Sequence, residues 1–78
     1  MLAEITYDLK DYKSAIKYIN QHLKFKPRDI DKMIMKAISF EQLRSFRESI
    51  ETHKKVLEFQ PYNTFSRDKV RELSNMVV

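Results

Sequence analysis

A dense run of hydrophobic positions lies in the middle of the chain, over residues 29–43. Steps of four, three and three place four of its side chains on one stripe of an α-helix: Met33, Ala37, Phe40 and Leu43. A second apolar stripe adjoins the first: Ile34, Met35 and Ile38. Because a helix that is apolar over more than half of its circumference needs cover on more than one side, this segment is expected to lie between two neighbouring helices.

The same helical period predicts four further helices, over residues 2–9, 12–25, 46–59 and 64–78. Residues that can cap a helix N-terminus precede four of the five segments: Asp11, Asp29, Ser45 and Asn63. Ser45, with Glu48 three residues later, forms the S-x-x-E pattern of a capping box. Pro27 and Pro61 end two of the helices, because the residue before a proline avoids the α conformation. No segment alternates at period two for more than a few residues, so we predict an all-α chain of about five helices.

The chain also resembles itself after a shift of 34 residues. Identical residues then coincide at the following positions: Met1 and Met35, Ala3 and Ala37, Leu9 and Leu43, Ile16 and Ile50, Leu23 and Leu57, Phe25 and Phe59, Pro27 and Pro61. Conservative pairs lie between them, such as Lys10 with Arg44 and Tyr12 with Phe46. A helix–turn–helix unit of this length is the period of the tetratricopeptide repeat.

In its second-helix positions the chain resembles the tetratricopeptide repeat (TPR) family. The aromatic, small, leucine and proline positions of that family are matched in order, twice: by Tyr12, Ala15, Leu23 and Pro27, and by Phe46, Ser49, Leu57 and Pro61. The resemblance implies a right-handed solenoid of antiparallel helix pairs in one domain, with a truncated first repeat (1–29), a second repeat (30–63) and a capping helix (64–78). The capping helix is expected to bury Val70 and Leu73. Frequent glycine positions of the family hold other residues here: Ala3, Lys10, Ala37 and Arg44.

Composition excludes several classes of protein. The 78 residues are enough for one small domain, and the absence of cysteine excludes disulfides and thiolate metal sites. No uncharged run approaches the roughly 18 residues of a membrane span, and the N-terminal stretch lacks the features of a signal peptide. The net charge of +4 describes a mixed, mildly basic surface. We therefore expect an intracellular protein of the cytoplasm, or alternatively the nucleus, that does not insert into membranes.

Catalysis finds little support in the residue pattern. His22 and His53 are the two histidines, and both fall where the resemblance places packing between helices, so we expect them to be partly buried and hydrogen-bonded. No metal-binding motif or carboxylate set accompanies them, and the serines lack a nearby base and a glycine elbow. The sequence predicts no enzyme, no metal and no cofactor.

The TPR resemblance implies a protein–protein interaction module, a scaffold, adaptor or co-chaperone-like unit, whose first helices line a groove for a peptide or a partner helix. The groove positions that we select are Tyr7, Asp31, Ile34, Met35, Ile38, Glu41, Phe65 and Lys69. The alternative is that Ile34, Met35 and Ile38 are core residues between helices. A lysine/asparagine/arginine clamp for acidic chaperone tails is not expected, because Lys69 alone among the matching positions suits it. An apolar or basic amphipathic segment fits these residues better.

Two further surfaces follow from the pattern. Lysines on one side of the second segment offer a phosphate-binding stripe within residues 10–28, and thus a nucleic-acid alternative: Lys10, Lys13, Lys17 and Lys24. No aromatic side chains interleave there to stack bases, so a solvated face explains the lysines better. The first helix has no preceding repeat to cover it, and we expect homo-oligomer formation through its exposed apolar residues: Leu2, Ile5 and Tyr7.

Overall fold

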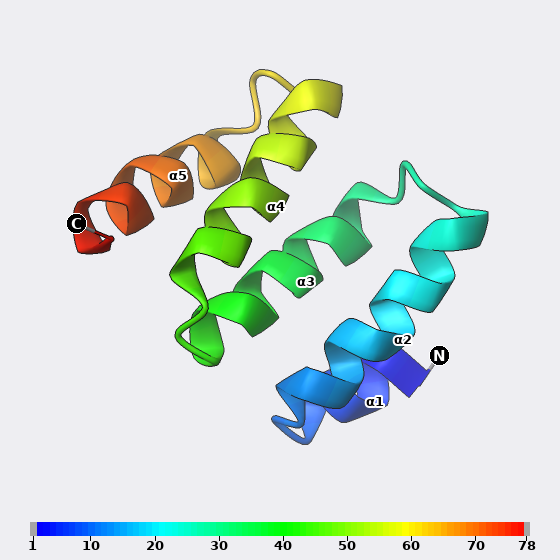
Figure 1. Cartoon of the computed structure of the whole chain (residues 1–78). Coiled ribbons are helices and arrows are strands. Elements are labelled where there is room, and N and C mark those ends of the chain that lie inside the picture. Colours follow the sequence, from blue (N-terminus) through cyan, green and yellow to red (C-terminus); the bar gives the residue numbers. More distant parts are fainter. Residues whose placement is uncertain (1, 78) are drawn as a thin grey trace.

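The computed structural model describes residues 2–77 and consists of five α-helices with no strand in that part of the chain. The helices are α1 (Leu2–Asp8), α2 (Tyr12–Phe25), α3 (Ile30–Gln42), α4 (Phe46–Phe59) and α5 (Thr64–Met76). The chain reverses its direction at each turn, so that successive helices run antiparallel (Figure 1). The predicted all-α class and number of helices are confirmed.

Each helix packs against its neighbour in sequence, and the central α3 is covered by α2 on one side and by α4 on the other (Figure 1). The expected double cover of the central helix is therefore confirmed. The buried apolar side chains include three alanines, which allow the helices to approach closely: Ala3, Ala15, Ile19, Met33, Ala37, Val56 and Leu73. The hydroxyl of buried Ser49 on α4 donates to the carbonyl of Ala37 on α3 at 2.8 Å, which ties the two helices together.

Positions that are 34 residues apart adopt the same local structure at the two tight turns. Lys10 and Arg44 both have left-handed backbones, with φ of 63° and 59°. The next residue's N–H then donates to a carbonyl in the last helical turn, from Asp11 to Thr6 and from Ser45 to Phe40, at 2.8 Å in each case. This is the Schellman arrangement, in which glycine is usual because a Cβ atom crowds the left-handed conformation.

We predict that Lys10→Gly and Arg44→Gly will each raise the free energy of unfolding by about 1 kcal/mol, because they relieve the left-handed strain at a helix end. Thermal denaturation followed by circular dichroism should show this as an increase in Tm of about 4–8 °C per variant. Lys13→Gly, at an exposed position inside α2, is the matched control and should lower stability by a similar amount. Destabilisation by all three variants would contradict the proposed strain.

Three of the four predicted N-caps are confirmed. The side chains of Asp11, Asp29 and Asn63 accept hydrogen bonds from the backbone N–H three residues later, at 3.3, 3.3 and 3.0 Å. The capping-box prediction is wrong, because the side chain of Ser45 makes no capping hydrogen bond. Ser45 has nearly the same backbone angles as Asp11, so the backbone conformation does not account for this difference.

Candidate functional site

The predicted groove residues lie on three helices that two ion pairs connect. Lys32 on α3 pairs with Glu4 on α1 (Nζ–Oε1 2.8 Å), and Glu41 on α3 pairs with Lys69 on α5 (3.2 Å). These pairs are near the two ends of α3 and lie on either side of the apolar residues that its middle carries. We call this the groove surface, and it comprises Tyr7, Asp31, Ile34, Met35, Ile38, Glu41, Phe65 and Lys69.

The apolar middle of the groove surface is half-buried. Ile34, Met35 and Ile38 are each neither fully enclosed nor fully exposed, whereas Met33 and Ala37 on the same helix are buried. Each of the three side chains therefore contributes to helix packing and still exposes part of its apolar surface. Such partly exposed apolar groups gain free energy when a second apolar surface covers them.

The groove surface has three charged residues at its rim, Asp31, Glu41 and Lys69, and two of them form an ion pair. The side chains of Glu41 and Lys69 are only 22% and 21% exposed, and they neutralise each other. Lys69 also lies 3.8 Å from Glu72 and 6.0 Å from the centre of the Phe65 ring. Asp31 is exposed and has no ion pair among residues 2–77, so it carries the negative charge of this rim.

Aromatic side chains stand at both ends of the groove surface. The Tyr7 ring packs edge-on against Tyr12 at 5.7 Å between centroids, and burial raises the pKa of the Tyr7 hydroxyl. Phe65 is 43% exposed and packs edge-on against His53 at 5.8 Å. Tyr7 on α1 and Phe65 on α5 thus each pack against a ring of the following or preceding helix and retain accessible area.

Both histidines are hydrogen-bonded, as the sequence predicts. Nε2 of partly buried His22 lies 2.7 Å from Asp29, which joins α2 to the start of α3, and this hydrogen bond lowers the pKa of Asp29. His53 is fully buried, and its Nδ1 lies 3.0 Å from the Ser66 hydroxyl on α5. Burial lowers the pKa of the His53 imidazole. Within residues 2–77, no cluster of three or more histidines, cysteines or carboxylates could hold a metal ion.

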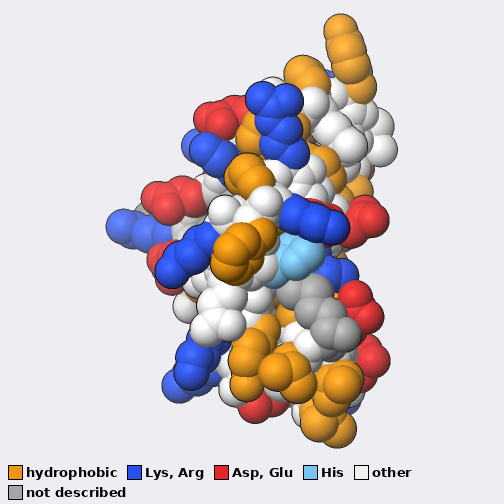
Figure 2. Space-filling view, turned by 90° about the vertical axis from the view of Figure 1, so that its right-hand side faces the viewer, with side chains coloured by type: hydrophobic (Ala, Val, Ile, Leu, Met, Phe, Trp, Pro, Cys, Tyr) orange, Lys and Arg blue, Asp and Glu red, His pale blue; other side chains and the backbone are white. Residues whose placement is uncertain are grey.

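The basic residues of α2 are exposed but do not form a continuous basic surface. Four lysines point to solvent in this region: Lys10, Lys13, Lys17 and Lys24. Figure 2 shows the side of the molecule on which α1 and α2 lie, with acidic and hydrophobic side chains interleaved among the basic ones. This arrangement is typical of a solvated helix face.

The first helix turns most of its apolar side chains outward. Leu2 and Ile5 are each 55% exposed, as predicted, whereas Tyr7 is partly buried. Leu9, which follows the helix, is 74% exposed. The α1 helix ends at Asp8, before Leu9, and Ala3 is the side chain that it buries. Self-association through this surface stays a prediction.

The ion pairs Glu4–Lys32 and Glu41–Lys69 could not be predicted from the sequence, because they join residues on different helices. The same holds for a pocket that Lys36 lines. The sequence contains one sign that His53 and Lys36 are unusual. The 34-residue shift aligns His53 with Ile19 and Lys36 with Leu2, so that two polar residues occupy positions that are apolar in the first unit.

Comparison with protein-family models finds no match for the chain, and comparison with curated proteins likewise finds none. Within residues 2–77, no helix is long and apolar enough to cross a membrane.

Proposed function

We propose that the chain is a non-catalytic protein–protein interaction module of the TPR type, acting as a scaffold or adaptor in the cytoplasm or nucleus. Its groove surface receives a peptide or an amphipathic helix. The observation that carries this proposal is the geometry of α3: its half-buried Ile34, Met35 and Ile38 lie between two ion pairs that hold α1 and α5 beside it. An apolar surface held by fixed neighbours is preorganised for binding, because little further ordering is needed.

The repetition of local structure supports the TPR type. Helices α2 and α4 both have 14 residues, and the turns at Lys10 and Arg44 have the same backbone geometry. Buried small residues recur after 34 positions: Ala3 and Ala37, Ala15 and Ser49. In this proposal the helix pairs form a right-handed solenoid of two repeats, over 1–29 and 30–63, and α5 closes it by burying Leu73.

The test of this function is capture of partners from a cell lysate, followed by mass spectrometry, with wild-type chain and the Ile34→Glu/Ile38→Glu variant. Proteins that the wild type retains and the folded variant loses are partners of the groove surface. Circular dichroism of both chains must first show equal helicity. If the two chains retain the same proteins, the groove surface is not the binding site.

For any partner found in this way, we predict that Met35→Glu will weaken binding by more than about tenfold, because it places a charge in the apolar middle of the groove. Helicity should change little, since Met35 is only half-buried. Isothermal titration calorimetry measures the affinity. A folded Met35→Glu chain that binds like wild type would refute the groove assignment, and an unfolded one would show that Met35 is a core residue.

Lys13→Glu/Lys17→Glu is the matched control, because these lysines are exposed on α2 and outside the groove surface. The proposal expects this double variant to bind the protein partner normally. The nucleic-acid alternative makes the opposite prediction: the double variant alone would lose binding, and wild-type affinity would fall steeply with salt concentration.

A further inference from the structure

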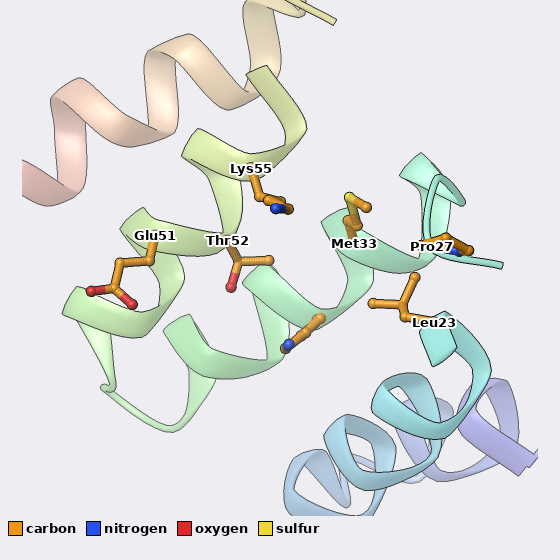
Figure 3. Close-up of a pocket in the computed structure, with 7 residues that line it drawn as sticks. Leu23, Pro27, Met33, Glu51, Thr52 and Lys55 are labelled. Carbon is orange, nitrogen blue, oxygen red and sulfur yellow. The ribbon is translucent and has the colours of Figure 1, made fainter. Parts of the chain in front are cut away.

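A pocket of about 380 Å³ lies between the end of α2, the first half of α3 and the middle of α4 (Figure 3). It shares no residue with the groove surface. Its lining consists of Leu23, Pro27, Met33, Lys36, Glu51, Thr52 and Lys55. Figure 3 shows Leu23, Pro27 and Met33 together on the α2–α3 side, opposite Thr52 and Lys55 on α4. We call it the α2–α4 pocket.

Lys36 brings an uncompensated positive charge to the apolar lining. Its side chain is partly buried, and it has no ion pair with another residue in 2–77. Its Nζ lies 5.9 Å from the centre of the Phe40 ring, which gives only weak compensation. Burial lowers the pKa of the Lys36 ammonium, so the charged form is less favourable there than in water. An anion that entered the pocket would remove this penalty.

The other charges in the pocket fit a single negative charge. Lys55 lies 3.5 Å from Glu58, but both side chains are mostly exposed, so this pair is weak and can be exchanged for a better partner. Glu51 points away from Lys55 and Met33 in Figure 3. When Lys55 leaves Glu58, the charged lining residues Lys36, Lys55 and Glu51 have a net charge of about +1, which matches a carboxylate better than a dianionic phosphate.

We infer that the α2–α4 pocket binds a segment of a partner protein that presents a carboxylate beside an aliphatic side chain. The carboxylate pairs with Lys36 and Lys55, while the aliphatic group packs against Leu23, Pro27 and Met33. Apolar walls strengthen the ion pair by excluding water, and the ion pair fixes the orientation of the segment. This second binding site is separate from the groove surface.

The test is a titration of the ¹⁵N-labelled chain by NMR with two peptides that differ only in charge: acetyl-Leu-Asp-Leu-amide and acetyl-Leu-Asn-Leu-amide. The aspartate peptide is expected to shift the amide signals of Leu23, Met33, Lys36 and Thr52. The asparagine peptide should bind at least about tenfold more weakly, which is the usual difference between charged and neutral hydrogen-bond partners. Equal affinity for the two peptides, or shifts confined to other residues, would overturn the inference.

Lys36→Met keeps most of the unbranched, apolar part of the side chain but removes its charge, and it should weaken binding of the aspartate peptide by about tenfold or more. The matched control is Lys54→Met, since Lys54 is exposed on the same helix as Lys55 but does not line the pocket. It should bind like wild type. Unchanged binding by folded Lys36→Met, or equal losses in both variants, would refute the role of Lys36.

A measurement on the wild type keeps the inference testable even if Lys36→Met fails to fold. The ¹³Cε signal of Lys36 reports its pKa, which should rise when the aspartate peptide binds and stay constant with the asparagine peptide. No rise would contradict the inference. Tighter binding of acetyl-Leu-phosphoserine-Leu-amide would overturn it in favour of a phosphopeptide. The two peptides and the Lys36→Met variant test the pocket without any substitution in the groove surface, so the pocket and the groove surface can fail independently.

Discussion

Leu73→Ala is expected to lower the free energy of unfolding by about 2–5 kcal/mol, which is the usual effect of truncating a fully buried leucine. Leu73 is 0% exposed and is the one large apolar side chain that α5 buries completely. It packs within the contact that joins α5 to α4. Since the core of a domain this small provides only about 3–5 kcal/mol of net stability, the loss should release α5 or unfold the chain.

Urea denaturation followed by circular dichroism measures this effect. The control is Met76→Ala on the same helix, because Met76 is 54% exposed and its truncation leaves no cavity. We expect the midpoint of Met76→Ala to stay close to that of wild type. Similar midpoints for Leu73→Ala and wild type would show that α5 does not contribute to the core, and that it does not close the repeat array.

The second large effect is a loss of stability in mild acid that depends on His53. The imidazole is fully buried on α4, its Nδ1 bonds to Ser66, and its Nε2 has no hydrogen-bond partner in the described chain. Glu41 and Lys69 are the nearby charges, and they act in opposite directions on the imidazole. Burial, the largest influence, holds the pKa of His53 below its usual value of about 6.5.

Because the folded chain disfavours protonated His53, the unfolded chain binds more protons just below pH 6.5. The free energy of unfolding should therefore be constant above about pH 7 and fall as the pH decreases below about 6.5. The pKa values of Glu4 and Asp29 are also lowered, from 4.5 and 3.8, so their stabilising contributions are lost only in stronger acid. Urea denaturation at intervals of half a pH unit resolves these two windows.

His53→Ile/Ser66→Ala should abolish the decline that begins below about pH 6.5. Isoleucine is the residue of the equivalent position in the first unit, where Ile19 is fully buried. At pH 7 the double variant should be about 1–3 kcal/mol more stable, because it removes a buried nitrogen without a partner. His22→Gln is the control and should retain the decline. Persistence of the decline in the double variant would show that another group titrates there.

The helices and most of their ends could be predicted because they depend on neighbouring residues. The segments 12–25 and 46–59 agree with α2 and α4, since the apolar period defines them and Pro27 and Pro61 follow. Asp11, Asp29 and Asn63 cap helices through hydrogen bonds to residues only three positions away. Ser45 was predicted wrongly because its side chain makes no capping hydrogen bond, and the S-x-x-E pattern does not specify which way that side chain turns.

The sequence by itself determined the all-α class, the five helices, the 34-residue repetition and the central place of α3, because these follow from local spacing and from which faces are apolar. Only the tertiary structure decided how far each side chain is buried and which distant charges meet. Ile34, Met35 and Ile38 are half-buried because the neighbouring helices cover part of each one. The negative charge of Glu41 is compensated because Lys69 approaches it from α5. The α2–α4 pocket likewise exists only because three helices leave a space beside Lys36. Such a space depends on the positions of the helices relative to one another, which the spacing of residues along one helix does not determine.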